Sequence, residues 1–584
     1  MNQSINRNIL WAQIFADRLI KAGIKNILIS PGSRNTPLIF VLSNNKFFNI
    51  KLIVDERTSG FFALGIANAT KTPSVIVTTS GTAVAELYPS IVEAYQQRIP
   101  LIVCTADRPS KLKNTGANQT INQINIYRNH IRKFYNAGLP SVSPLRLKNF
   151  AKNIDNMLDI CATFNKGPVH INFPFEKPFE PDSYTDKIDS KIFEDIFNLK
   201  HNLKTLKKSE IKFPKKFVSE LLNERSGIIF CGGGNFSNGF RSKLTKLSEM
   251  LNYPIIADGT SPLRMGKFGK KNIIVNATAF LRSPVISKTV APKIILQFGK
   301  APTSNSLLQF IKNSSAEIYS VDEFGDMHDP SRKTKHIFKI IPEEFLNLLI
   351  KKLEGEKIAS TNFKKQLLSL EKFSEKNKSN IIYNSHYPFE GRIINEIINS
   401  IPNNSNLFIS NSTPVRDLDF FAPKTSKNIS IFTNRGASGI DGIVSTSLGI
   451  AAADKKPAFL VIGDLALYHD INSLQITKEY NINLKIILVD NNGGGIFNML
   501  PVAEYKTVFN KFFNTKLNID FAALIKGFGC DYFPIKSWEN LSDKLSSGKS
   551  NSNVSVLHIK TDSKKSLSIR QKYWDSVAKN NQHY

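Results

Sequence analysis

The stretch AFLVIGDLALYHDINSLQITKEYNINLKIILVDNNGG (458–494) decides the fold class of this 584-residue chain. Two apolar runs rich in β-branched residues open and close it, and both have the length of buried strands. Between them Leu467, Ile471 and Leu474 recur at the spacing of one helix face, which predicts a single helix packed on a sheet. A strand–helix–strand unit of this kind is right-handed, so both strands end at the same edge of a parallel sheet.

Polar residues stand at both of these strand ends. Asp464 and Asn491 are therefore predicted neighbours, although they lie 27 positions apart. A carboxylate, an amide oxygen and a backbone carbonyl from the glycine turn form a hard-oxygen set that suits Mg²⁺ or Ca²⁺, and Mg²⁺ leaves places for phosphate oxygens. The alternative is that Asp464 caps a helix and that Asn491 begins an ordinary turn. Asp464 alone, or the turn at Asn491 alone, favours that alternative, whereas the two strand ends together favour a metal–diphosphate site.

The same alternation of strands and helices occurs in two earlier blocks, which predicts an α/β fold of three doubly wound parallel-sheet domains in series. Strands are expected at NILIS (26–30), KLIVD (51–55), SVIVTT (74–79), PLIVCTAD (100–107), PVHINFP (168–174), GIIFCGGG (227–234), YPIIADG (253–259), KIILQFG (293–299), EIYSVD (317–322), NLFISNS (406–412) and VSVLHI (554–559). The expected domains are 1–185, 217–350 and 386–584, joined by linkers at 186–216 and 351–385.

Composition excludes several classes of protein. The net charge of +29 comes from lysine spread along the whole chain, and no basic, aromatic-interleaved motif marks a nucleic-acid site. No run reaches the roughly 18 apolar residues that cross a bilayer. The N-terminus is typical of an amphipathic helix and not of a signal peptide, so we expect a cytoplasmic protein without membrane insertion. The four cysteines lack metal-ligand spacing and are expected to be buried free thiols.

Several segments go beyond a general metal–diphosphate pattern. They are SPGSRNTPL (30–38), DERTSGFFALGIA (55–67), TSGTAVAELYPSIVEA (79–94), TADRP (105–109), GANQTI (116–121), NSTPVRD (411–417), NRGASGIDG (434–442) and NNGGGIFNMLP (491–501). Together with the thiamine-diphosphate fingerprint that begins at Asp464, they closely resemble the 2-succinyl-5-enolpyruvyl-6-hydroxy-3-cyclohexene-1-carboxylate synthase family. The resemblance covers both outer domains and is weak in the middle one. One departure is Asp490, which stands where the fingerprint usually has asparagine.

The resemblance implies a reaction and its cofactors. The family decarboxylates 2-oxoglutarate on thiamine diphosphate and adds the product to isochorismate, in menaquinone or phylloquinone biosynthesis. It implies that Asp464, Asn491 and the carbonyl of Gly493 hold Mg²⁺, with Mn²⁺ as an alternative ion. It also implies a homo-oligomer, a dimer or a tetramer, whose active sites lie between chains.

Glu56 is the expected catalytic acid, in the segment Asp55-Glu56-Arg57 between a strand and a helix. A carboxyl group hydrogen-bonded to the aminopyrimidine promotes the imino tautomer that deprotonates the thiazolium, and an apolar pocket raises its pKa. On its own Glu56 would be explained as a carboxylate favoured by the helix dipole. The metal–diphosphate site expected later in the chain makes the catalytic role the preferred interpretation of Glu56.

By motif position, further residues are assigned to the two dicarboxylate substrates and to the cofactor. Guanidinium groups bind carboxylates in a bidentate manner, which favours arginine in such sites. The expected substrate residues are Ser33, Arg34, Arg108, Asn118, Gln119, Ser412, Arg416 and Arg435. Arg34 and Gln119 join Glu56 as expected catalytic residues, with Ser33 beside them at isochorismate, whereas Ser412 and Arg416 would hold the succinyl carboxylate. Ile440, Ile496 and Phe497 are expected to contact the cofactor, although ordinary core packing also explains apolar residues.

The middle domain departs from the family. Asn305 stands where a basic residue is expected to reach substrate, so either Lys300 replaces that residue or the contact is absent. The glycines at 232–234 lack a dinucleotide spacing and are interpreted as a structural turn.

Two other functions predict features that differ from those of the sequence. An acetolactate-synthase-like carboligase predicts a pocket for small monocarboxylates, which the arginine-bearing motifs disfavour. A non-enzymatic basic protein predicts the loss of Glu56 or Asp464, and both are present.

Overall fold

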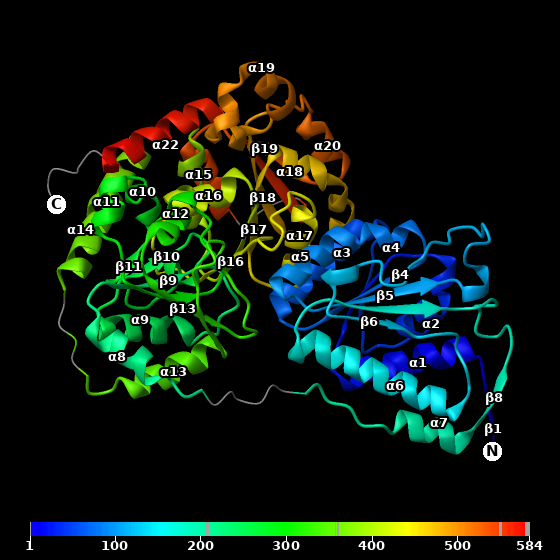
Figure 1. The fold of residues 1–584 in the computed structure, drawn as a ribbon. Coiled ribbons are helices and arrows are strands. Elements are labelled where there is room, and N and C mark those ends of the chain that lie inside the picture. Colours follow the sequence, from blue (N-terminus) through cyan, green and yellow to red (C-terminus); the bar gives the residue numbers. More distant parts are fainter. Residues whose placement is uncertain (1, 205–210, 357, 359–360, 548–551, 579–584) are drawn as a thin grey trace. The chain divides into compact units, whose positions relative to one another are not determined.

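Three six-stranded parallel sheets, each with helices on its faces, make up the fold (Figure 1). The computed structural model describes residues 2–204, 211–356, 358, 361–547 and 552–578. Each apolar run expected to be a strand overlaps one, although the run 51–55 shares only its first two residues with a strand, and the predicted fold class is confirmed. A short antiparallel pair, β1 (Asn2–Ile5) with β8 (Asp186–Asp189), is separate from these sheets.

The N-terminal sheet is covered by α1 and α6 on one face and by α3, α4 and α5 on the other (Figure 1). From edge to edge its strands are β3 (Asn49–Leu52), β2 (Asn26–Ile29), β4 (Ser74–Thr78), β5 (Leu101–Asp107), β7 (Val169–Pro174) and β6 (Lys133–Asn136). Its helices are α1 (Arg7–Lys21), α2 (Thr36–Ser43), α3 (Glu56–Thr70), α4 (Thr82–Glu86), α5 (Tyr88–Gln97) and α6 (Pro144–Asp159), followed by α7 (Ser190–Phe197). Because β2, β4 and β5 are neighbours, the loops after them meet at one edge.

The middle sheet has a core on each face because its strands alternate their apolar side chains. Ile229 and Leu296 face α8, α9 and α13, whereas Ile228 and Ile295 face α10, α11 and α12. The strand order is β11 (Ile273–Ile274), β10 (Ile255–Ala257), β9 (Gly227–Cys231), β12 (Ile294–Phe298), β13 (Glu317–Asp322) and β14 (His336–Lys339). The helices are α8 (Lys215–Asn223), α9 (Phe240–Leu251), α10 (Ala277–Phe280), α11 (Pro284–Thr289), α12 (Asn305–Asn313) and α13 (Pro342–Lys352).

The C-terminal sheet carries the two strands from which the fold was first predicted. Its order is β16 (Ile429–Phe432), β15 (Ser405–Ile409), β17 (Ala458–Gly463), β18 (Leu484–Asp490), β20 (Val554–Lys560) and β19 (Asp531–Pro534). β17 and β18 are parallel neighbours, as predicted. One face packs on α15 (Glu390–Ser400), α16 (Thr413–Phe421), α21 (Trp538–Ser546) and α22 (Ser563–Ala578). Other helices of this region are α14 (Asn362–Asn384), α17 (Ile443–Ala453), α18 (Asp464–His469), α19 (Lys506–Val508) and α20 (Phe521–Gly527).

The chain divides into two compact units. The first unit contains residues 1–207, 434–455 and 466–484, and the second contains 208–433, 456–465 and 485–584. Helix α17 belongs to the first unit because it packs closely on α3. A Cβ added at Gly65 would lie 2.1 Å from the carbonyl oxygen of Thr446, and one added at Gly449 would lie 2.2 Å from that of Phe62. The two helices therefore cross with their backbones in contact, which only glycine permits at these positions.

Two features differ from the sequence expectations. The helix expected through Leu467, Ile471 and Leu474 is interrupted: α18 ends at His469 and a 3-10 helix runs over Ile471–Thr477. Asp470 lies at the break, buried, and accepts hydrogen bonds from the backbone nitrogen and the hydroxyl of Ser445 at 2.7 and 2.8 Å. Those bonds to α17 explain why the helix does not continue.

The expected linkers also contain regular structure. Residues 186–216 include β8 and α7, and residues 351–385 include α14. Positions 205–210, 357 and 359–360 of these stretches lie outside the described residues. All four cysteines are buried free thiols, as expected.

Candidate functional site

Glu56 is the first residue of α3, directly after the N-cap Asp55. The carboxylate of Asp55 accepts a hydrogen bond from the backbone nitrogen of Thr58 at 3.1 Å, and its other oxygen accepts one from the amide of Asn472. This cap fixes where the helix begins and so fixes the position of Glu56. Burial raises the pKa of Glu56, and the nearby charges of Asp55 and Glu86 raise it further. A carboxyl group that retains a proton can donate a hydrogen bond.

Two arginines lie close together at the edge of the N-terminal sheet. Arg34, in the turn Ser33–Asn35, donates to the carbonyl of Phe175 at 2.9 Å and lies over the ring of Phe179 at 4.6 Å. Burial lowers the pKa of Arg34, and the positive charge of Arg108 lowers it further. In the part of the chain that the structure describes, Nη1 of Arg108 is buried without a hydrogen-bond partner. Two neighbouring, incompletely paired cations are suited to an anionic ligand.

Gln119 faces the same edge from the irregular segment that also carries Asn118. Its amide donates to the carbonyl of Ser80 at 3.0 Å, and its backbone φ of 55° is in the left-handed region. A Cβ at Gly81 would lie 2.8 Å from Cγ of Gln119, so glycine is required there. The loop after β4 therefore holds Gln119 close to the sheet.

A buried amide that the sequence did not reveal supports this edge. Gln123 accepts from the backbone nitrogen of Gly81 at 3.1 Å and donates to Asn172 at 3.0 Å. Asn172 in turn donates to Asp107 at 2.9 Å, and Asp107 accepts from the backbone nitrogen of Arg108 at 2.7 Å. The chain of hydrogen bonds links the loops that carry Gln119 and Arg108. In the sequence, the position of Gln123 four residues after Gln119 is the one feature that could have indicated its supporting role.

The loop 434–442, which carries Arg435 and Ile440, is held within the first unit by Glu93. Glu93 is buried in α5, and its carboxylate accepts hydrogen bonds from the backbone nitrogens of Gly436 and Ala437 at 2.7 and 2.6 Å. Gly442, with φ of 64°, ends the loop and begins α17. Glu93 lies inside one of the motifs that carry the family resemblance. Nothing in the sequence, however, indicated that its side chain binds this loop.

Asp464 and Asn491 lie at the ends of the adjacent strands β17 and β18, as the strand–helix–strand pattern predicted. Asp464 accepts a hydrogen bond from the backbone nitrogen of Gly493 at 2.7 Å, which joins the two strand ends directly. Burial raises the pKa of Asp464 to about 7, and the charge of Asp490 contributes to that rise. A buried carboxylate beside a second one favours a bound cation.

The donors of this turn fit a divalent cation. Oδ1 of Asn491 is buried and has no hydrogen-bond partner among the described residues. The carbonyl of Gly493 accepts from the nitrogen of Gly495 at 2.9 Å, which leaves its second lone pair for a ligand. Carboxylate, amide and carbonyl oxygens are the ligands that Mg²⁺ prefers.

Asp490, the residue that departs from the fingerprint, has its own hydrogen-bond partner. Nε2 of His558, on β20, lies 2.8 Å from the carboxylate of Asp490, and Tyr532 contacts the other ring nitrogen at 2.8 Å. Burial alone would raise the pKa of Asp490, but the hydrogen bond with His558 lowers it.

Ser412 and Arg416 lie in the second unit, at the start of α16. The backbone of Ser412 has φ of 72°, a strained conformation for a residue with a side chain, and such strain is common at functional sites. Nη1 of Arg416 donates to the carbonyl of Ser412 at 2.7 Å, so the guanidinium turns back over the helix start. Ile496 and Phe497 follow the turn at 491–493 in a 3-10 helix and are half-buried.

In the middle domain Lys300 is fixed by its backbone, whose nitrogen donates to the carbonyl of Gly233 at 2.9 Å. A Cβ at Gly232 would lie 2.0 Å from the carbonyl oxygen of Lys300, so the glycine run is a close-packed turn. Asn305 begins α12.

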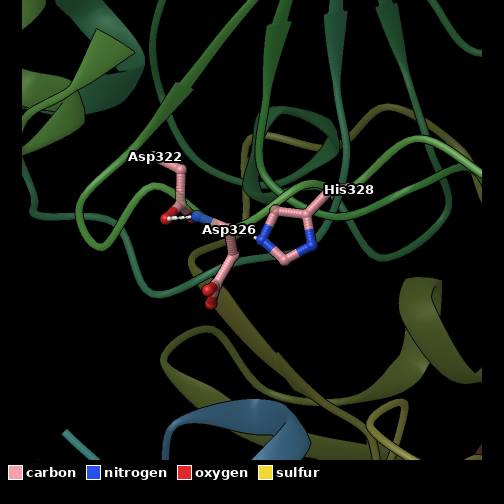
Figure 2. Close-up of side chains that lie close together, drawn as sticks. All are labelled: Asp322, Asp326 and His328. Atoms are coloured by element: carbon pink, nitrogen blue, oxygen red, sulfur yellow. Dashed lines mark hydrogen bonds and ion pairs between the residues drawn. The ribbon is translucent and has the colours of Figure 1, made fainter. Parts of the chain in front are cut away.

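Asp322, Asp326 and His328 form a second group with metal-ligand side chains, at the end of β13 and in the turn that follows it (Figure 2). Oδ1 of Asp322 accepts from the backbone nitrogens of Phe324 and Asp326, both at 2.8 Å, and its other oxygen lies 3.2 Å from Nε2 of His328. These bonds close the turn, and they account for the position of Asp322 without an ion.

Models of thiamine pyrophosphate enzymes match all three α/β blocks. "Thiamine pyrophosphate enzyme, N-terminal TPP binding domain" matches residues 11–126, "Middle domain of thiamine pyrophosphate" matches 200–409, and "Thiamine pyrophosphate enzyme, C-terminal TPP binding domain" matches 423–559. Together with the three parallel sheets and the polar strand ends, these matches define an enzyme that uses thiamine pyrophosphate, also called thiamine diphosphate.

Similar proteins narrow the class. A 2-succinyl-5-enolpyruvyl-6-hydroxy-3-cyclohexene-1-carboxylate synthase from Bacillus cytotoxicus is 34% identical over 98% of this chain and 97% of its own length. Synthases with the same name from Bacillus velezensis and Listeria innocua are each 33% identical, over 94% and 97% of this chain and 94% and 96% of their own lengths. The chain belongs to the 2-succinyl-5-enolpyruvyl-6-hydroxy-3-cyclohexene-1-carboxylate synthase family. Within the described residues no helix is long and apolar enough to cross a bilayer.

Proposed function

We propose that the protein decarboxylates 2-oxoglutarate and joins the remaining succinyl-semialdehyde carbanion equivalent to isochorismate by 1,4-addition, with release of CO₂. The product, 2-succinyl-5-enolpyruvyl-6-hydroxy-3-cyclohexene-1-carboxylate, lies on the route to menaquinone or phylloquinone. The observation that carries this proposal is similarity to synthases of that name over nearly the whole chain. An acetolactate-synthase-like activity is not favoured, because the relatives and the neighbouring side chains of Arg34 and Arg108 both indicate a dicarboxylate substrate.

Thiamine diphosphate, when bound, supplies the carbanion chemistry. Asp464, Asn491 and the carbonyl of Gly493 would hold Mg²⁺, or Mn²⁺ in its place, and the unpaired Oδ1 of Asn491 supports that assignment. Ile440, Ile496 and Phe497 would contact the cofactor rings. Glu56 would hold a proton on its carboxyl group and share it with the pyrimidine nitrogen, and its raised pKa suits that task.

The substrate anions would be bound by arginine and neutral hydrogen-bond donors. Ser33, Arg34 and Gln119 would bind isochorismate. Arg108 and Asn118 would also bind substrate, and the incompletely paired guanidinium of Arg108 supports this role. Arg34 and Gln119 would also orient the reacting atoms. Ser412 and Arg416 would bind the succinyl carboxylate, and Arg435 would contact one of the two substrates. The strained backbone of Ser412 supports its assignment.

We further propose a homo-oligomer, a dimer or a tetramer, with active sites formed by two chains, on the basis of the family resemblance. Co-expression of Glu56→Gln and Asp464→Ala chains tests this arrangement. If each site takes Glu56 from one chain and Asp464 from another, mixed dimers regain one intact site and the preparation reaches about a quarter of wild-type activity. If both residues act within one chain, activity remains absent.

The activity itself is tested with purified protein, Mg²⁺ and thiamine diphosphate. We expect CO₂ release from 2-oxoglutarate that depends on isochorismate, and mass spectrometry identifies the adduct. Faster turnover of pyruvate would support the acetolactate-synthase-like alternative instead. The Glu56→Gln variant should bind thiamine diphosphate but lose most turnover, and unchanged activity would refute the role of Glu56.

A further inference from the structure

A buried hydrogen-bond network lies directly behind the proposed metal turn, within the second unit. Nδ2 of Asn491 donates to Oε1 of Glu390 at 3.2 Å. Glu390, the first residue of α15, is 3% exposed and was not among the residues that the sequence indicated. Because a carboxylate only accepts hydrogen bonds, it can face the NH₂ of an asparagine but not its oxygen. The opposite end of the amide, Oδ1, is buried and finds no hydrogen-bond partner among the residues that the structure describes.

Glu390 is itself held on both oxygens. Oε2 accepts from Nη2 of Arg570 at 2.7 Å, and Oε1 also accepts from the hydroxyl of Thr561 at 3.0 Å. The backbone nitrogen of Thr561 donates to the carbonyl of Asp490 at 2.7 Å, so the end of β20 is tied to the same turn. The carboxylate therefore has a single position, and Asn491 must adapt to it.

Arg570 extends the network to α16. Its Nε and Nη2 bind both carboxylate oxygens of Asp417 at 2.9 and 2.7 Å. Burial alone would lower the pKa of Arg570, but the two carboxylates raise it, so the guanidinium stays charged. Two carboxylates and one guanidinium leave one net negative charge, which favours a cation nearby. Asp417 follows Arg416, so one arginine joins the metal turn to the proposed succinyl site.

We infer that Glu390 is a positioning residue that orients the amide of Asn491 so that its oxygen, not its nitrogen, faces the divalent cation. This inference rests on the proposed metal role of Asp464 and Asn491 and deepens it. Residues that orient a metal ligand commonly change metal affinity by about 10- to 100-fold when they are replaced.

Glu390→Gln is the direct test, because it preserves shape and removes one acceptor. Glutamine cannot accept from both Arg570 and Asn491: if its oxygen faces Arg570, its NH₂ faces Asn491 and turns that amide over. We expect the affinity for Mn²⁺, measured by electron paramagnetic resonance in the presence of thiamine diphosphate, to fall about 10- to 100-fold. An affinity within about twofold of wild type would overturn the inference.

Glu371→Gln is the matched control. Glu371 is also buried in the second unit, and it accepts from the nitrogens of Val275 and Asn276 at 3.1 and 2.9 Å and from Lys424 at 3.0 Å. Its loss should lower thermal stability yet leave Mn²⁺ affinity unchanged. An equal loss of Mn²⁺ affinity in this control would mean that general destabilisation, and not orientation of Asn491, explains the effect.

A double-mutant cycle isolates the orientation itself. In an Asn491→Asp background both side-chain oxygens are equivalent, so turning the group over costs nothing. We expect Glu390→Gln to weaken Mn²⁺ binding there by no more than about threefold. The same loss in both backgrounds would overturn the inference.

Two further measurements keep the test decisive. If Glu390→Gln does not fold, Thr561→Val removes the hydroxyl that fixes Oε1 and keeps both charges. Thr561→Val should weaken Mn²⁺ binding severalfold in the protein with Asn491 and should not weaken it in the Asn491→Asp background. Unchanged Mn²⁺ binding in the protein with Asn491 would contradict the positioning role of Glu390. If the wild-type protein with thiamine diphosphate binds no Mn²⁺, or if Asp464→Ala binds it as tightly, the proposed metal site itself fails.

Discussion

Replacement of Glu93 by glutamine would test how the loop 434–442 is held. The Glu93 carboxylate, 3% exposed, accepts from the backbone nitrogens of Gly436 and Ala437 at 2.7 and 2.6 Å. Glutamine keeps one acceptor and turns an NH₂ toward the other nitrogen. A hydrogen bond to a charged group contributes about 1.5–3 kcal/mol, and an unpaired buried donor costs about 1–3 kcal/mol. We therefore expect a loss of about 3 kcal/mol in the free energy that holds this loop.

Hydrogen exchange measures that loss at the loop itself. A loss of about 3 kcal/mol corresponds to roughly 100-fold faster exchange of the Gly436 and Ala437 amides, if the loop opens locally. Thermal unfolding of the first unit should begin at a lower temperature, by roughly 6–12 °C if the whole loss is global. Since the loop carries Arg435 and Ile440, kcat/KM should fall as well.

Glu194→Gln provides the control, because Glu194 is an exposed residue of α7 in the same unit. It removes one negative charge without touching the loop, and neither exchange nor activity should change. Unaltered exchange at Gly436 and Ala437 in Glu93→Gln would refute the reasoning, whatever happens to activity.

Three further predictions concern the proposed metal turn, a buried histidine and the helix crossing. Asp464→Ala should weaken binding of Mg²⁺ and thiamine diphosphate together in calorimetric titrations, and intact binding would contradict the assignment. Burial lowers the pKa of His170 to about 3 from 6.5, so the folded state resists protonation of this side chain. The free energy of unfolding therefore falls as the pH drops below 6.5, by roughly 2 kcal/mol at pH 5. His170→Gln should show a shallower loss between pH 7 and pH 5 in denaturant titrations, and an equal slope would argue against this source. Gly449→Ala should cost about 1–3 kcal/mol by forcing α3 and α17 apart, and an unchanged melting temperature would mean that the helices are not in contact.

The central strands of all three sheets could be predicted because they are buried on both faces and are continuously apolar. The edge strands β6, β11, β14, β16 and β19 were missed. Four of them, β6, β14, β16 and β19, are largely half-exposed, with mixed residues such as KFYN in β6 and HIFK in β14, and β11 has only two residues. Such runs lack the periodicity that marks a strand, because their pairing comes from the neighbouring strand and not from their own apolar content.

In the site, Asp464 and Asn491 could be paired from sequence because a strand–helix–strand unit fixes where both strands end. Glu93 and Glu390 could not be found in this way. Each is a lone acid in a helix, and its partners lie far along the chain: Gly436 is 343 positions from Glu93, and Arg570 is 180 from Glu390. Local pattern contains no information about such contacts, since only the packing of separate elements creates them.

The crossing of α3 and α17 has a consequence for synthesis on the ribosome. About 370 residues separate the end of α3 from the start of α17. At about 5–20 residues per second, α3 emerges roughly 20–70 s before its partner. During that interval the nascent chain exposes the surface of α3 around Phe61 and Gly65 that α17 later covers, so chaperone protection during translation should matter more for this protein than its ordinary composition suggests.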